Sequence, residues 1–188
     1  MSELLATDVM KVVRRFRLKN LVETGTGPHS SGLEVAANLG LHGYSCDIDP
    51  KYCSAARKTH PNFEIYNSDS LTFLANVLPR IAEPTFIWCD AHFANEKLNT
   101  KLPPWPLYEE LKIIRKSRDS NRHVIWCDDM QHVLGDNPIK DEVVGIDRHE
   151  ENGGRWRGDE RSIQEYVAPF LDSHLCYIEG TILKMEPR

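Results

Sequence analysis

Short apolar runs alternate with segments of helical periodicity along most of the chain. The runs predict strands that begin at Leu21 and that cover 44–49, 63–66, 85–89 and 123–127. The apolar spacing between them predicts helices at 4–16, 32–39, 51–58, 70–78 and 107–118. Strands and helices that alternate at this rhythm are typical of an α/β fold with a mostly parallel sheet and right-handed crossovers.

The C-terminal part breaks this rhythm. After a helix near 162–171, two apolar runs at 175–178 and 181–185 are joined only by Glu179 and Gly180. This connection is too short for a crossover, so it predicts an antiparallel β-hairpin in which one strand runs against the rest of the sheet. The expected fold is a mostly parallel seven-stranded sheet with this hairpin at its end and helices on both faces.

The length of 188 residues fits one domain that spans 1–188. The first helix falls within 1–19. Residues 130–161 have little periodicity and are rich in Gly, Asp, Glu and Arg. A stretch of this length inside a compact domain predicts an active-site loop, with disorder as the alternative.

Composition excludes several classes of protein. With 40% hydrophobic and 27% charged residues, the chain is an ordinary globular protein, and its net charge of −5 does not favour nucleic acid as a partner. No apolar stretch reaches transmembrane length and the N-terminus has no signal-peptide pattern, so we expect a cytoplasmic protein without membrane contact. The cysteines form no CxxC pair, which predicts reduced thiols and no zinc site. They are Cys46, Cys53, Cys89, Cys127 and Cys176.

A glycine-bearing turn follows the first predicted strand. Residues 22–27 read VETGTG, and a predicted helix begins a few residues later. Glycine lets a backbone turn tightly and lets a ligand approach it closely. A strand, such a turn and a helix with unpaired first amides together predict a site for a polar ligand at the top of the sheet.

With the terminal hairpin, the order of motifs resembles the class I S-adenosylmethionine-dependent methyltransferase family, whose fold is Rossmann-like. The resemblance covers residues 20–187. VETGTG resembles the family's glycine motif, which lies along the methionine part of the cofactor, although Thr24 and Thr26 depart from its commonest form. Asp47 stands where the family's acidic residue takes the ribose hydroxyls, with Asp49 as the nearby alternative. NSDS at 67–70 resembles the motif that contacts the adenine.

The resemblance implies S-adenosylmethionine as the cofactor and a set of residues that would bind it. These are Glu23, Thr24, Gly25, Thr26, Gly27, Ser31, Asp47, Ile48, Ser68, Asp69, Ser70 and Asp90.

Two predicted strands end in the same way. Residues 87–90 and 125–128 both read IWCD, so Asp90 and Asp128 would emerge side by side if the strands are neighbours about 4.8 Å apart. Asp129 adds a third carboxylate. Three converging carboxylates repel one another, and a hard cation such as Mg²⁺ resolves that repulsion. Alternatively, one of these acids caps a helix or pairs with an arginine.

This pattern is similar to the metal-dependent O-methyltransferases. The similarity implies that Asp90, Asp128 and Asp129 bind Mg²⁺, and that the reaction is O-methylation of a small hydroxyl-bearing acceptor. Asp90 and His92 are the predicted catalytic residues. A histidine at this edge titrates near neutral pH and could remove the hydroxyl proton, although it could equally be structural.

Three other functions remain open. One is a metal-independent N- or O-methyltransferase. Another is a nicotinamide-dependent oxidoreductase, because Gly25 and Gly27 match two glycines of the G-x-G-x-x-G fingerprint, although Ser30 occupies the third position. The last is a non-catalytic binding protein, because a fold does not dictate a function. The chain has little beyond one domain with which to hold a macromolecule, so a small acceptor is expected, and a homo-oligomer is compatible with the sequence.

Overall fold

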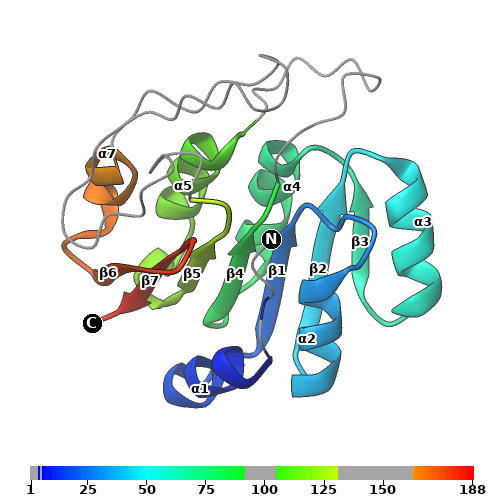
Figure 1. The fold of residues 1–188 in the computed structure, drawn as a ribbon, viewed down its shortest axis with the longest axis horizontal. Helices are drawn as coiled ribbons and strands as arrows, with labels where there is room; N and C mark the ends of the chain where they lie inside the picture. Colours follow the sequence, from blue (N-terminus) through cyan, green and yellow to red (C-terminus); the bar gives the residue numbers. More distant parts are fainter. Residues whose placement is uncertain (1–3, 5, 92–104, 131–162) are drawn as a thin grey trace.

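The structure is a computed structural model that describes residues 4, 6–91, 105–130 and 163–188. A seven-stranded sheet runs through the middle of the molecule in the order β3-β2-β1-β4-β5-β7-β6, with helices on both sides (Figure 1). The strands are β1 (Asn20–Thr24), β2 (His42–Asp47), β3 (Glu64–Asn67), β4 (Thr85–Cys89), β5 (Val124–Cys127), β6 (His174–Glu179) and β7 (Ile182–Pro187). This confirms the predicted fold class.

The helices fall where the apolar spacing predicted them. The α-helices are α1 (Ala6–Phe16), α2 (Ser31–Leu39), α3 (Pro50–Thr59), α4 (Ser70–Val77), α5 (Leu107–Lys116) and α7 (Ile163–Val167). Short 3₁₀ turns are η1 (Leu78–Arg80), η3 (Ser120–Arg122) and η4 (Ala168–Phe170). Sequence features set several helix starts: Asp49 and Asp69 cap α3 and α4 through their side chains, and Pro50 occupies the first turn of α3.

The C-terminal hairpin has the predicted direction but a different turn. β7 pairs antiparallel with both β5 and β6, whereas the other strand pairs are parallel. The two turn residues are Gly180 and Thr181 rather than Glu179 and Gly180, because β6 continues through Glu179. Gly180 has a φ of 63°, which a two-residue hairpin turn favours and glycine adopts readily.

Both faces of the sheet are packed. On one face, α4, α5 and α7 bury apolar side chains against residues such as Val22, Ile87 and Ile125. On the other, α1 and α2 pack over neighbouring positions such as Leu21, Phe86 and Val124. The alternation of side chains along each strand explains why these strands are apolar on both sides.

The topology fixes where a ligand site can form. The sheet order reverses between β1 and β4, and the carboxyl ends of β1 through β5 lie at one edge. In open α/β sheets, ligands bind outside the carboxyl ends of the strands at such a reversal point. The glycine turn after β1 occupies this point.

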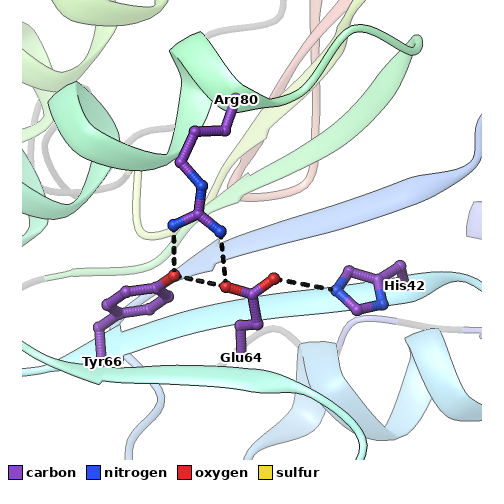
Figure 2. Close-up of polar contacts among 4 residues, drawn as sticks. All are labelled: His42, Glu64, Tyr66 and Arg80. Carbon is purple, nitrogen blue, oxygen red and sulfur yellow. Dashed lines mark hydrogen bonds and ion pairs between the residues drawn. The ribbon is translucent and has the colours of Figure 1, made fainter.

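A polar cluster ties the outer strands together away from that edge (Figure 2). Glu64 at the start of β3 accepts from Arg80 at 2.8 Å and from the Tyr66 hydroxyl at 2.5 Å, and His42 at the start of β2 lies 3.4 Å from its other oxygen. These groups are largely exposed, so each contact contributes little stability. The cluster is structural, and it is not part of the candidate site.

Among the described helices, none is both long and apolar enough to cross a membrane. The predicted active-site loop at 130–161 lies outside the described residues except for Met130, whose amide donates to the Thr181 carbonyl of the hairpin turn at 2.9 Å.

Candidate functional site

The turn between β1 and α2 is built from two glycines with left-handed backbones. Gly25 has a φ of 80° and Gly27 a φ of 58°. The amides of Gly25 and Thr26 both donate to the Cys46 carbonyl, at 3.0 and 2.9 Å, so the turn folds over the end of β2. Ser30, at the position of the third fingerprint glycine, is also left-handed, with a φ of 51°. A strained non-glycine residue at this position indicates that the turn is held firmly in one shape.

Glu23 lies beneath this turn and is fully buried. Its carboxylate accepts from the Gly32 amide at the start of α2 and from the Ser45 hydroxyl of β2, each at 2.7 Å. The pKa of Glu23 is raised to about 8, chiefly by burial and to a smaller extent by the Asp90 and Asp47 carboxylates, against the lowering effect of the two hydrogen bonds. Glu23, which the resemblance gives as a cofactor-binding residue, therefore supports the glycine turn from inside the protein.

The two threonines of the motif are also turned into the protein. Thr24 accepts from the Asp90 amide through its carbonyl and its hydroxyl, at 3.1 and 3.2 Å, which joins β1 to the end of β4. The Thr26 hydroxyl lies 2.6 Å from the Ser45 hydroxyl. Both threonines are buried, so their side chains shape the turn from within.

Asp47 and Asp49 have different roles at the end of β2. Asp47 accepts from the Gly27 amide and from the Asp49 amide, each at 2.8 Å, and its side chain is half-buried. Burial raises the pKa of Asp47. Asp49 caps α3 by accepting from the Lys51 amide at 2.8 Å. Of the two acids, only Asp47 contacts the glycine turn through its side chain.

The NSDS motif closes the edge after β3. The Asn67 side chain donates to the carbonyls of Asp47 and Ile48, at 3.0 and 3.1 Å, and thereby ties the ends of β2 and β3 together. Asp69 caps α4 by accepting from the Thr72 amide at 2.8 Å. The Ser70 hydroxyl is buried and has no hydrogen-bond partner within the described structure. This oxygen has essentially no exposed surface, so it is closed to a ligand in this structure.

Asp90 and Asp128 emerge side by side, as the matched strand ends predicted. Cys89 and Cys127 are register partners, and the Asp128 amide donates to the Cys89 carbonyl at 3.0 Å. Asp128 accepts from the Asp129 amide at 2.7 Å, and Asp129 has a left-handed backbone with a φ of 58°.

Metal binding finds no support in this geometry. Within the described ranges, no group of three or more His, Cys, Asp or Glu side chains is arranged to hold a metal ion. Asp128 and Asp129 are buried, and Asp90, Asp128 and Asp129 all interact with other groups of the chain. The three-carboxylate Mg²⁺ site therefore stays a prediction that the described residues do not support.

The remaining predicted site residues divide into two groups. Ser31 and Ile48 are half-buried, the former at the first position of α2 and the latter directly after β2. His92, the predicted general base, lies outside the described residues.

Two residues that support the site were not predicted. Ser45 links Glu23 to Thr26, and Gly32 allows α2 to approach Glu23, because a Cβ there would lie 2.4 Å from the carboxylate. A buried serine inside a strand is only a weak sequence signal. The glycine follows Ser31 within the motif region, but its contact becomes visible only in three dimensions.

We compared the chain with known families, curated proteins and solved structures. No protein-family model and no curated protein matches the chain. Among solved structures, DesVI from Streptomyces venezuelae matches with a TM-score of 0.59 at 13% identity, over 97% of this chain and 90% of that one. The chain has the class I S-adenosylmethionine-dependent methyltransferase fold. The seven-stranded sheet with its antiparallel β7 confirms the fold class that the sequence predicted.

Two further matches carry different chemistry on the same fold. The S-adenosylmethionine-bound CalS10 from Micromonospora echinaspora, an amino pentose methyltransferase, matches with a TM-score of 0.57 at 15% identity, over 97% of this chain and 90% of that one. A proposed caffeoyl-CoA O-methyltransferase from Staphylococcus aureus matches with a TM-score of 0.57 at 12% identity, over 99% of this chain and 84% of that one. At these identities the likeness establishes the fold and not the acceptor.

Proposed function

We propose that the chain is an S-adenosylmethionine-dependent methyltransferase that acts on a small molecule. The observation that carries this proposal is the contact between the glycine turn and β2. The Gly27 amide donates to Asp47, and this turn follows β1, the strand next to the point where the sheet order reverses. This brings the predicted methionine-binding and ribose-binding elements together in one rigid unit.

The residues at this edge fit the cofactor. The Asp47 oxygens accept from the Gly27 and Asp49 amides, and the Ile48 amide also acts on this carboxylate, so with four lone pairs at least one can accept from a ribose hydroxyl. No atom of the described residues lies within 4 Å of the position where a Gly27 Cβ would be, so these residues leave room above the turn. The NSDS motif at 67–70 would contact the adenine, as the resemblance implies.

The chain's own residues would act mainly by positioning. S-adenosylmethionine supplies, when bound, an electrophilic methyl group on a sulfonium. Asp47 would hold the ribose, and the Gly25–Gly27 turn would hold the amino-acid part, which fixes the direction of the methyl group. Transfer needs an in-line approach of the acceptor atom, so this orientation supplies much of the rate.

The acceptor atom and the metal are finer predictions within this proposal. The resemblance favours oxygen, and nitrogen is the alternative, because proteins of both kinds share the fold. Assistance by Mg²⁺ is a question for experiment, because no group of three or more His, Cys, Asp or Glu side chains among the described residues is arranged to hold a metal ion.

A nicotinamide dinucleotide is the weaker ligand. Its fingerprint requires a third glycine that brings the helix and strand into close contact, and Ser30 stands at that position. The C-terminal hairpin with antiparallel β7 belongs to the methyltransferase fold.

The test is a transfer assay with S-adenosylmethionine that carries a tritiated methyl group, run against separate pools of small alcohols, phenols and amines. Label transfer that the Asp47→Ala variant loses is the expected result. Loss on addition of EDTA and recovery with Mg²⁺ would establish metal assistance, whereas insensitivity to EDTA would exclude it. Tight S-adenosylhomocysteine binding without transfer to any pool would favour a non-catalytic binding protein.

A further inference from the structure

The exposed apolar side chains of the protein gather at one edge of the sheet. β6 is the last strand in the sheet order, and among the described strands only β7 pairs with it (Figure 1). In the described part of the chain, the large apolar side chains that are exposed are Leu171 (50%), Leu175 (54%) and Tyr177 (38%). Two of them lie on β6 and the third lies three residues before it.

β6 also lacks the features that usually protect an edge strand from pairing. Such strands are commonly very short, or carry charges, a proline or a bulge. β6 has six residues and no proline, and each of its residues pairs with one residue of β7, so it has no bulge. Its one acidic residue, Glu179, lies at its end. The outer side of β6 is therefore suited to accept another strand.

One hydrogen bond shows which backbone groups of β6 face outward. The Arg188 amide donates to the Ser173 carbonyl at 3.1 Å, so the backbone of Ser173 faces the β7 side. Along antiparallel strands this direction alternates, so every second residue after Ser173 also faces β7. The residues between them direct their amides and carbonyls away from the sheet, and they are His174, Cys176 and Ile178.

We propose that β6 pairs antiparallel with β6 of a second copy of this chain, about a two-fold axis that passes through Cys176. Cys176 then lies opposite Cys176 of the second copy, and His174 lies opposite Ile178, so each outward-facing residue meets another. The same register places Leu175 opposite Tyr177 of the second copy, twice in the dimer. The two exposed apolar side chains of β6 thereby cover each other.

Other registers match less well. An axis at Leu175 places Tyr177 opposite Ser173, and an axis at Tyr177 places Leu175 opposite Glu179. Each of these registers pairs an apolar side chain with a polar one and leaves one outward-facing residue without its match. An axis between two residues would bring side chains from opposite faces of the sheet together, because opposite residues of antiparallel strands share a face. The strand is thus most complementary to itself in the register centred on Cys176.

The charges at the two ends of β6 favour the same partner. Arg188 lies at the beginning of the strand, where its Nε donates to the outward His174 carbonyl at 3.1 Å. That carbonyl has a second lone pair for the new strand. Glu179 lies at the other end of the strand, with its side chain 67% exposed. Antiparallel pairing brings Arg188 of each copy to the end of the strand where Glu179 of the other copy lies.

The test is sedimentation velocity of the wild type, Cys176→Pro and Cys176→Ser over a range of concentrations. Proline removes the outward amide of Cys176 and leaves the pairing with β7 in place, because edge strands accept proline where the N–H faces away from the sheet. Serine keeps that amide. We expect a species of twice the chain mass in the wild type and in Cys176→Ser, and a dimer dissociation constant about tenfold higher or more in Cys176→Pro.

A second variant tests the same interface without a change in the backbone. Leu175 is exposed, so Leu175→Lys should leave the fold of the single chain intact, and a lysine on an edge strand opposes pairing. We expect the dissociation constant of this variant to rise about tenfold or more as well. Circular dichroism and urea denaturation of each variant provide the control for folding.

The register has a test of its own. Leu175→Cys and Tyr177→Cys are prepared as separate proteins, each with Cys176→Ser, and are mixed in the presence of oxidised glutathione. Opposite residues of a non-hydrogen-bonded antiparallel pair have Cα atoms about 4.5 Å apart, within the range that a disulfide spans. We expect a covalent dimer in the mixture and none in either protein alone.

The contrary outcomes are specific. A wild type that stays monomeric at every concentration, or a dimer whose dissociation constant is the same in Cys176→Pro and Leu175→Lys, would overturn the proposal. A mixture that forms no more covalent dimer than each protein alone would overturn the register at Cys176. None of these measurements involves a cofactor, so their failure would leave the proposed function unaffected.

Discussion

Gly25 lies directly against the backbone of Asp90. A Cβ at Gly25 would be 2.5 Å from the Asp90 carbonyl oxygen and 2.9 Å from its carbonyl carbon. The glycine turn after β1 and the residue after β4 are thus packed together without space for any side chain. This contact joins the two strands on either side of the point where the sheet order reverses.

The two glycines of the turn should therefore respond differently to the same substitution. Gly27→Ala places its Cβ in open space and should cost only the left-handed strain, about 1–2 kcal/mol. Gly25→Ala adds a backbone clash to that strain and should cost clearly more. Urea denaturation of both variants measures the difference. Equal losses of stability would show that Gly25 and Asp90 are not in this contact.

Substitutions of Asp47 and Asp49 at the end of β2 should have different effects, one mainly on cofactor affinity and the other mainly on stability. Asp47→Ala should weaken S-adenosylhomocysteine binding by tenfold or more, because it removes the predicted ribose ligand and the support of the Gly27 amide. Asp49→Ala removes the α3 cap and should cost about 0.5–2 kcal/mol of stability with little change in affinity. Calorimetric titration and urea denaturation of both proteins provide the comparison. If Asp49→Ala had the larger effect on affinity, the assignment of the acidic residue would have to be exchanged.

Glu23 should also affect the pH dependence of stability. Its pKa rises to about 8 in the folded protein from an ordinary value of 4.5, so the folded state keeps a proton that the unfolded state loses. The stability of the wild type should decrease relative to that of Glu23→Gln as pH rises from about 5 to 8, by ~1.4 kcal/mol per pH unit at the steepest. Urea denaturation across this range measures the effect, with Glu34→Gln on the exposed surface as the control. Parallel curves for wild type and Glu23→Gln would contradict the buried proton.

His123 should limit stability in acid. Its Nδ1 accepts from the Thr85 amide at 3.3 Å and burial lowers its pKa to about 4, whereas an ordinary histidine titrates near 6.5. Stability should therefore decrease as pH falls from 6.5 to 4, because only the unfolded state takes up the proton. Asn at this position retains an acceptor that does not titrate, so His123→Asn should lose part of this decrease, whereas the exposed His29→Asn should not. An unchanged acid profile in His123→Asn would assign the decrease to other groups.

The sequence was sufficient to predict the sheet because each strand carries its own signal. The apolar runs at β4 and β5 required burial on both faces, and their identical IWCD endings predicted correctly that Asp90 and Asp128 are neighbours. The short connection near Gly180 predicted the hairpin. The predicted position of the turn was wrong by one residue, because Glu179 still belongs to β6 and pairs with Ile182.

The candidate site was harder to predict because its side chains are arranged by contacts between distant segments. Asp129 adopts a left-handed backbone, which periodicity does not reveal, and no group of side chains that could hold a metal is found among the described residues. Glu23 and Thr26 were predicted from a motif, but the motif does not say that both are buried and joined through Ser45. These relationships depend on how β1, β2 and α2 pack against one another. The pattern of residues along the sequence does not reveal that packing.

The most direct test of the central claim is a calorimetric titration of the wild-type protein with S-adenosylhomocysteine and, separately, with NAD⁺. We expect saturable one-site binding of S-adenosylhomocysteine and no measurable binding of NAD⁺. Binding of NAD⁺ without binding of S-adenosylhomocysteine would contradict the proposed cofactor, and with it the roles given to Asp47 and the glycine turn.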